Sequence, residues 1–185
     1  MVSELIKKCR SYRRFDADKK ISREELFAIA ENARYTASAA NLQRLRFALF
    51  TEAGDTDTIF SGLRFAAYLS SWGGPTVSER PVAYVVICSE CALDVNLAID
   101  LGISSEAILL AAIEGGIGGC IFRSFNPDVL TPLLPDGLIP HAVIALGYPA
   151  ETVVVSDSLD GEIKYYRDAQ DRHVVPKLPA KKIII

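Results

Sequence analysis

Within the segment CRSYRRF, residues 9–15, the four positions 10–13 bring two arginines and a serine hydroxyl close together in the sequence. Arg10, Ser11 and Arg13 lie within four positions and can converge on one phosphate, because arginine side chains donate paired hydrogen bonds to phosphate oxygens. A solvated basic stretch between two helices would carry the same residues. The segment therefore indicates a candidate anion site, with the solvated stretch as its alternative.

A second polar group, SAANLQ at residues 38–43, follows the second helix that the sequence pattern predicts. Its small residues let a planar ligand approach the backbone, while Ser38, Asn41 and Gln43 offer hydrogen-bond donors and acceptors. Such a set suits the pyrimidine edge of a flavin. A polar connecting loop is the alternative interpretation.

The glycine cluster GGIGG at residues 115–119 does not fit a dinucleotide-binding motif. That motif follows a strand and opens a helix, whereas this cluster follows a predicted helix. The third glycine of the motif would fall at Ile121. We therefore do not expect a Rossmann fold.

Cys88 and Cys91 form a CxxC motif at the end of a predicted strand. A structural zinc site needs four ligands, and the other cysteines and histidines show no ligand spacing. Glu90 opposes the thiolate that a thioredoxin-like site requires.

His141 and His173 are isolated, so we expect core or surface roles for both. The sequence shows no serine–histidine–aspartate or cysteine–histidine arrangement, and we predict neither a metal site nor a catalytic side chain.

The composition indicates an ordinary globular domain. Half of the 185 residues are hydrophobic and 23% are charged, and one domain over residues 1–185 fits this length. The net charge of −3 and the pI of about 5.4 argue against nucleic-acid binding. Apolar stretches such as residues 81–88 are too short to cross a bilayer, and the N-terminus lacks the features of a secretory signal. We therefore expect a cytoplasmic protein that does not bind membranes.

Hydrophobic periodicity predicts helices and strands that mix without regular βαβ alternation. Ser22 and Glu25 form the capping-box pattern S-x-x-E at the start of a helix, and the glycines at 115–116 would close a later helix. The predicted helices cover residues 3–10, 22–35, 56–69 and 97–114. The predicted strands cover residues 47–51, 82–88 and 142–146, with a final hairpin of 163–167 and 173–175. This mixture is typical of an α+β fold.

The order and spacing of these motifs resemble the nitroreductase family. CRSYRRF resembles the family's N-terminal R-R-S-x-R-x-F pattern, and TASAANLQRLRF is similar to its A-P-S-x-x-N-x-Q-P-W-x-F. GGIGGCIF looks like the G-L-G-T-C-W-I loop, and IPHAVIALGYP looks like the P-V-A-L-I-A-L-G-Y-P strand. The ending HVVPK resembles the basic C-terminal motif of short members. The resemblance spans essentially the whole chain.

This resemblance implies a single FMN-binding domain with a central, mainly antiparallel sheet flanked by helices. It also implies an interlocked homodimer with two FMN sites at the interface. The motif around residues 38–43 matches the one that reaches the flavin of the partner subunit in the family. The positions that match flavin-binding positions are Arg10, Ser11, Arg13, Ser38, Asn41, Gln43, Gly119, Cys120, Ile121 and Lys177.

Three sites depart from the family pattern. Cys9 replaces the first basic residue of R-R-S, Arg44-Leu45 replaces Pro-Trp, and Leu178 stands where many relatives have arginine. These departures suggest altered phosphate contacts and altered packing at the interface.

The implied activity is hydride transfer from NADH or NADPH to a small electron-poor acceptor, such as a nitroaromatic or a quinone, by a ping-pong mechanism. The flavin supplies the chemistry, so no protein nucleophile is expected, and Arg13 is the candidate cation beside the pyrimidine edge. One alternative is a flavin-binding or flavin-handling protein with little reductase turnover. Another is a dithiol or metal protein built on the CxxC motif.

Overall fold

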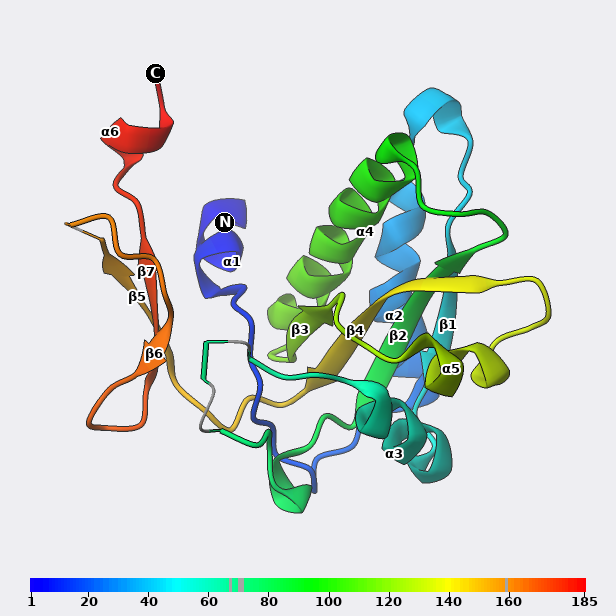
Figure 1. Ribbon diagram of the computed structural model, residues 1–185, viewed down its shortest axis with the longest axis horizontal. Helices are drawn as coiled ribbons and strands as arrows, with labels where there is room; N and C mark the ends of the chain where they lie inside the picture. Colours follow the sequence, from blue (N-terminus) through cyan, green and yellow to red (C-terminus); the bar gives the residue numbers. More distant parts are fainter. Residues whose placement is uncertain (67, 70–71, 159) are drawn as a thin grey trace.

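The computed structural model describes residues 1–66, 68–69, 72–158 and 160–185. Its central sheet is built from β1 (Arg46–Phe50), β2 (Ala83–Ser89), β3 (Gly118–Phe122) and β4 (Ile139–Gly147). These strands are antiparallel and lie in the order β1-β2-β4-β3 (Figure 1). The two middle strands are almost entirely buried. Because both of their faces are covered, they read as continuous apolar runs rather than as alternating patterns.

Helices cover both faces of the central sheet. The α-helices are α1 (Val2–Lys8), α2 (Arg23–Glu31), α3 (Ala53–Gly62), α4 (Val95–Glu114), α5 (Pro127–Leu130) and α6 (Ala180–Ile183). Short 3₁₀ helices lie at Asn32–Tyr35, Ala39–Asn41, Val77–Glu79 and Thr131–Leu133. α2 and α4 form one buried cluster with the sheet, and α3 and α5 form the other. The expected α+β fold with a flanked antiparallel sheet is confirmed.

Helix α4 is the longest helix in the described chain. It has 20 residues and a mean hydropathy of 1.5, so by length and composition alone it could cross a membrane. The expectation that the apolar stretches are too short to cross a bilayer therefore fails for α4. Its apolar residues extend beyond the charged residues Asp100 and Glu106 in both directions. Core helices pass the same test, and the inner face of α4 packs on the sheet. Val95, Ile99 and Ile103 form an exposed apolar stripe at helical spacing.

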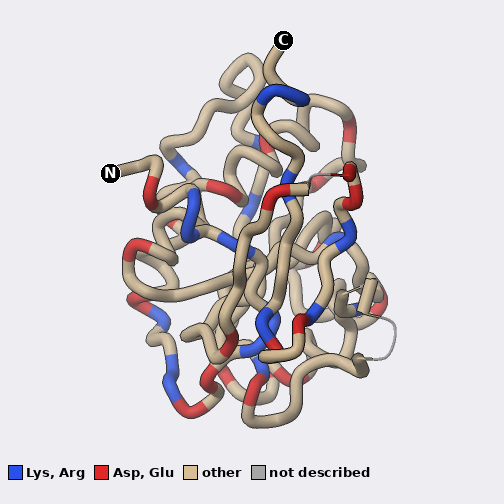
Figure 2. The backbone as a smooth tube through the Cα atoms, turned by 90° about the vertical axis from the view of Figure 1, so that its left-hand side faces the viewer, with Lys and Arg blue, Asp and Glu red and all other residues tan. Residues whose placement is uncertain are grey.

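A second, smaller sheet lies beside the central one, with β7 as its middle strand (Figure 1). It consists of β5 (Val153–Asp157), β6 (Tyr166–Arg167) and β7 (His173–Lys177). β7 pairs in parallel with β5 and antiparallel with β6. Figure 2 views the molecule from this side, where basic and acidic residues are interspersed along the chain. The antiparallel pair confirms the predicted hairpin, whereas the parallel strand β5 was not predicted.

The segment of residues 9–15 runs between the two sheets and lies along the edge strand β3. Ser11 forms a parallel bridge with Gly119, and the Tyr12 N–H donates to the Gly119 carbonyl at 3.0 Å. Two glycines permit this close packing: an added Cβ would lie 2.6 Å from the Tyr12 ring at Gly118, and 2.8 Å from the Phe15 ring at Gly147. The segment therefore continues the sheet beyond its last strand.

Helix boundaries differ from the sequence prediction most clearly at the ends of two helices. The helix predicted at 56–69 ends at Gly62, because Leu63 is extended and bridges to Phe125; residue 67 of that prediction lies outside the described residues. The helix predicted at 22–35 ends at Glu31 and continues as a 3₁₀ turn. Ser22 accepts a hydrogen bond from the Glu25 N–H at 3.1 Å, which is one half of the predicted capping box.

Candidate functional site

A cavity of about 340 Å³ opens between the N-terminal segment, α4, β3 and the second sheet. We call it the arginine cavity. Five of the predicted site residues line it together: Arg10, Ser11, Arg13, Ile121 and Lys177. Elements from both ends of the chain therefore meet at one place. The structure brings the predicted anion-binding segment and the basic C-terminal residue to the same cavity.

The arginine cavity carries an excess of positive charge. Within the described part of the chain, Arg10, Arg13 and Lys177 form no ion pair with a carboxylate. The Nε of Arg10 is buried without a hydrogen-bond partner. Glu106 also lines the cavity, and burial together with this carboxylate raises the pKa of Cys9 to about 11. Three cations around one cavity, with a buried unused donor, fit an anionic ligand.

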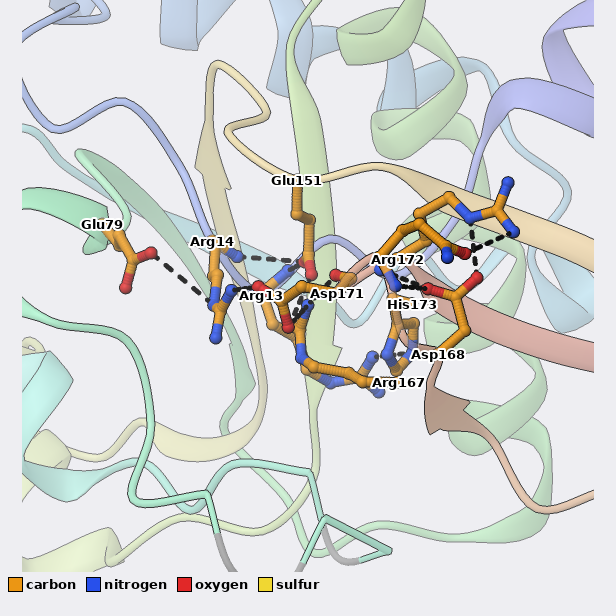
Figure 3. A network of polar contacts seen from close by, with 10 residues as sticks. Arg13, Arg14, Glu79, Glu151, Arg167, Asp168, Asp171, Arg172 and His173 are labelled. Atoms are coloured by element: carbon orange, nitrogen blue, oxygen red, sulfur yellow. Dashed lines mark hydrogen bonds and ion pairs between the residues drawn. The ribbon is translucent and has the colours of Figure 1, made fainter.

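Arg13 is held by several groups at once (Figure 3). Its Nη1 lies 3.2 Å from the Ser11 carbonyl oxygen and 3.0 Å from Nε2 of His173. Its guanidinium also stacks on Tyr165, with 4.8 Å between Cζ and the ring centroid. Its backbone N–H donates to the Glu151 carboxylate. The sequence identified Arg13 but none of the three side chains that orient it.

Glu151 joins the N-terminal segment to the second sheet. Its side chain is only 2% exposed and forms a 2.7 Å ion pair with Arg167 on β6. The same carboxylate accepts from the backbone N–H of Arg14 at 3.0 Å. Arg14 in turn pairs with Asp171 at 2.5 Å and with Glu79 at 3.6 Å (Figure 3). Because Glu151 is satisfied by these partners, it fixes the backbone that carries Arg13.

The second predicted motif lies at a different cavity, of about 390 Å³, between α2, α4 and β1. Ser38 and Gln43 line this cavity, whereas Asn41 is exposed outside it. Asp100 on α4 anchors the motif: it accepts from the Ser38 hydroxyl at 2.7 Å and from the Ala39 N–H at 3.1 Å. The Gln43 N–H donates to the Ser38 oxygen at 3.0 Å. Within one chain the two predicted motifs therefore do not meet.

The backbone of residues 38–43 adopts a conformation that is uncommon outside glycine. Ala40, Asn41 and Gln43 have φ angles of 50°, 55° and 48°. Residues in this region carry strain that persists only when the surroundings hold it, and such strain is concentrated at functional sites. The buried carboxylate of Asp100 provides that hold. The sequence analysis did not select Asp100; an acidic residue inside an apolar helix is the signal that could have identified it.

The three predicted residues of β3 play different parts. The Ile121 side chain faces the arginine cavity, whereas Cys120 is 4% exposed and packs in the cluster on the opposite face of the sheet. Burial raises the pKa of Cys120. A Cβ at Gly119 would lie 2.5 Å from Leu109 and 2.8 Å from Leu146, so this glycine allows close packing against the core. Only Ile121 offers its side chain to the cavity.

The departures from the family pattern have local structural roles. Cys9 packs into the buried cluster beneath α4 and also lines the arginine cavity. Arg44 forms two hydrogen bonds with Asp94, at 2.6 and 3.0 Å, and these lower the pKa of Asp94 to about 2. Asp94 is also the N-cap of α4, accepting from the Leu97 N–H at 2.8 Å. Leu178 follows β7 and is 37% exposed.

Neither the CxxC cysteines nor His141 lines the arginine cavity or the cavity at residues 38–43. Cys88 is fully buried and Cys91 is partly buried, and both thiols are free. Burial raises the pKa of Cys88 to about 11. His141 lies 2.8 Å from the Ser89 hydroxyl in the sheet interior, as a core histidine would. His173 differs, because it is both buried and part of the arginine cavity.

Comparison with known proteins finds a family match in the N-terminal part of the chain. Residues 6–72, which contain both predicted motifs, match the model of the nitroreductase family. The resemblance to the nitroreductase family is confirmed. The match includes the segment that lines the arginine cavity and the segment that Asp100 anchors.

Solved nitroreductase structures share this fold. The nitroreductase family protein of Streptococcus pneumoniae TIGR4 is 18% identical, with a TM-score of 0.69 over 100% of this chain and 99% of that one. A putative nitroreductase of Desulfovibrio desulfuricans, solved in complex with FMN, is 23% identical, with a TM-score of 0.65 over 81% and 87%. CLA-ER, an enone reductase of gut-bacterial fatty acid saturation, is 19% identical, with a TM-score of 0.68 over 86% and 93%. These likenesses establish a nitroreductase-like fold.

Proposed function

We propose that the protein is an FMN-dependent oxidoreductase that passes electrons from NADH or NADPH to a small electron-poor acceptor. The observation that carries this proposal is the arginine cavity. Its three cations have no carboxylate partner among the described residues, and they lie in and beside the segment that matches the nitroreductase family. Unpaired cations around one cavity favour an anion such as the phosphate of FMN.

The donor set suggests a division of roles in the proposed site. Arg10, Ser11 and Lys177 would hold the phosphate, because they supply charge and hydrogen-bond donors at one cavity. Arg13, held in place by its neighbours, would present its charge to the pyrimidine edge of the ring. Bound FMN would supply the two-electron chemistry, and the protein would supply orientation, charge and an apolar wall that includes Ile121.

The second motif enters the proposal through a twofold dimer. Ser38 and Gln43 line their own cavity, and Asn41 is exposed, so none of them reaches the arginine cavity of the same chain. A second copy would bring its motif to that cavity, and symmetry would create two equivalent composite sites. The exposed stripe on α4 offers apolar surface for such a contact; its residues Val95, Ile99 and Ile103 are 41–76% exposed.

The related structures support the acceptor class. One was solved with FMN, and another is an enone reductase. The first supports the cofactor, and the second supports a conjugated, electron-poor acceptor, which for this protein we propose to be a nitroaromatic, a quinone or a similar compound.

The proposal is tested by the colour and redox behaviour of the purified protein. We expect a yellow protein that releases FMN, not FAD, on denaturation, and whose flavin absorbance is bleached by NADH or NADPH without oxygen. Addition of a quinone or nitroarene should restore the absorbance. A protein that binds FMN but is not reduced would favour a flavin-handling role. A colourless protein that takes up no added FMN would reject the proposal.

A further inference from the structure

His173 occupies a firmly held position at the start of β7. It is 1% exposed, and its backbone N–H donates to the Thr152 carbonyl at 2.8 Å. It pairs with Val153 on one side and Arg167 on the other, so both neighbouring strands fix its backbone. The imidazole lines the arginine cavity. This placement gives the ring little freedom to move.

The contact between His173 and Arg13 determines which ring nitrogen carries the proton. Nε2 of His173 lies 3.0 Å from Nη1 of Arg13 (Figure 3). A guanidinium has no acceptor, so Nε2 must present its lone pair and the ring proton must lie on Nδ1. Burial and the Arg13 charge lower the pKa of His173 to about 4, with Arg167 acting in the same direction and Glu151 against it. The ring is therefore a neutral acceptor at pH 7.

The other contacts of the Arg13 side chain leave its direction less defined. The Ser11 carbonyl accepts from the same Nη1 at 3.2 Å, and that carbonyl belongs to Arg13's own segment. The Tyr165 ring centroid lies 4.8 Å from Cζ of Arg13. This stacking constrains the plane of the guanidinium more than its rotation within that plane. Tyr165 also packs against His173, with ring centroids 5.1 Å apart. His173 is thus the side-chain acceptor that links the guanidinium of Arg13, as distinct from its backbone, to the second sheet.

We propose that His173 is a positioning residue, which accepts a hydrogen bond from Arg13 and thereby fixes the direction in which this guanidinium meets the anionic ligand of the arginine cavity. The inference rests on the proposed function for the identity of that ligand. His173 opens the ending HVVPK, of which the family resemblance assigns only Lys177 as a flavin-binding position. Its effect on the ligand would act through Arg13.

A matched pair of variants tests the proposal. The Gln side chain in His173→Gln can place an acceptor near the position of Nε2, whereas the Asn side chain in His173→Asn is one methylene shorter and cannot reach Arg13. We expect the Kd for FMN, measured by quenching of flavin fluorescence, to stay within about twofold for His173→Gln and to rise about tenfold for His173→Asn. Circular dichroism and thermal melting verify that both variants are folded.

A second readout separates positioning from general packing. If Arg13 faces the reduced flavin, weakening its hold should affect the reduced form more than the oxidised form. A tenfold difference between the two forms corresponds to a midpoint potential about 30 mV more negative in His173→Asn. In the Arg13→Met background, His173→Asn should add no further change to either readout. An equal, additive change in that background would assign His173 a purely structural role and overturn the proposal.

The wild-type protein provides an independent measurement if His173→Asn does not fold. The ¹⁵N chemical shifts of labelled histidine, assigned with His173→Gln, should show a neutral ring protonated on Nδ1 at pH 7. A ring protonated on Nε2, or charged, would overturn the proposal. Failure of wild-type protein to bind FMN would instead reject the proposed function, whereas normal binding and potential in His173→Asn would reject only the role of His173.

Discussion

The three cations of the arginine cavity are held to different degrees. Arg13 is fixed by the Ser11 carbonyl, His173 and the face of Tyr165. Arg10 donates to the Ile6 carbonyl at 2.7 Å, whereas Lys177 is an exposed side chain at the end of β7. One charge therefore has a defined direction and another can adapt. This division suits a ligand with a rigid ring and a flexible phosphate arm, as the proposed FMN has.

The buried imidazole of His173 should make stability depend on pH. Its pKa is about 4 in the folded protein and has the ordinary histidine value of about 6.5 in the unfolded chain, so the unfolded state binds a proton first as the pH falls. The free energy of unfolding should therefore decline between about pH 6.5 and 4, by up to about 3 kcal/mol from this group. His173→Gln lacks the titration, so its stability relative to wild type should improve as the pH falls.

Urea unfolding of both proteins at pH 7, 5.5 and 4.5 measures this difference. His141, whose pKa is also lowered by burial, is present in both proteins and cancels. A stability difference that stays constant over this range would contradict the prediction.

The CxxC thiols should be dispensable for flavin binding. Burial raises the pKa of Cys88 to about 11, which leaves little thiolate to react near neutral pH, and neither cysteine lines the arginine cavity. We expect Cys88→Ser with Cys91→Ser to keep the flavin content and turnover of the wild type. Stability should fall by about 1 kcal/mol, because a hydroxyl replaces a buried thiol. A folded, flavin-loaded double variant without activity would revive the dithiol hypothesis.

At the scale of elements, α4 connects the two predicted motifs. Its Asp100 anchors residues 38–43, while Glu106 and Leu109 line the arginine cavity. Both segments therefore take their position from one rigid helix. Asp94, the N-cap of that helix, is in turn held by Arg44, so Arg44, one of the departures from the family pattern, supports the start of α4.

Asp100→Asn should release the strained segment that Asp100 holds. The carboxylate accepts two hydrogen bonds, and an amide can replace only one of them as an acceptor. We expect a loss of about 1–3 kcal/mol in unfolding free energy, together with weaker FMN binding. The control is Asp128→Asn on the exposed start of α5, which should change stability by only a few tenths of a kcal/mol. Equal stability in Asp100→Asn and wild type would show that the loop does not depend on this carboxylate.

The sequence predicted those elements whose patterns are local. The helix at 97–114 and the strands at 82–88 and 142–146 correspond to α4, β2 and β4 within a few residues. β3 was missed, because its glycines serve close packing against Tyr12 and Leu109 and carry no strand pattern. The helix predicted to 69 was too long, because the bridge from Leu63 to Phe125 is a tertiary contact.

The candidate site was predictable where its chemistry lies in one segment. Arg10, Ser11 and Arg13 could be chosen from sequence, and the structure places them at one cavity. Glu151 and His173 could not be chosen, because their role depends on a second sheet that folds back onto the N-terminal segment. Long-range pairings of this kind leave no local signal.

At the scale of the whole molecule, the separation of the two motifs leads to a test of the proposed dimer. Arg10→Glu places a negative charge at the arginine cavity, and Asn41→Asp places one on the second motif. Either homodimer carries its lesion at both sites, so FMN binding should weaken. In a mixed dimer of composite sites, one site receives both lesions and the other receives neither. Separately tagged chains, co-purified as the heterodimer, should therefore bind about half the wild-type amount of FMN.

The symmetry argument also defines the contrary result. If both motifs served a site within one chain, each site of the heterodimer would still carry one lesion, and no flavin would be regained. Asn41→Asp should disturb the backbone little, because aspartate tolerates the φ of 55° found there. A heterodimer as poor in FMN as the two homodimers would refute the composite site and leave the FMN assignment standing.

The bridge between Ser11 and Gly119 has a consequence for solubility. β3 is an edge strand, and an uncovered edge offers its free backbone groups to the strands of other molecules. Ser11 and Tyr12 cover part of that edge, so the segment that carries Ser11 to its proposed place beside the phosphate also protects the sheet from aggregation. Substitutions in this segment are therefore constrained both by ligand binding and by the need to cover the sheet edge. A substitution there that pulls the chain away from β3 would lower the yield of monodisperse protein before any loss of ligand affinity could be measured.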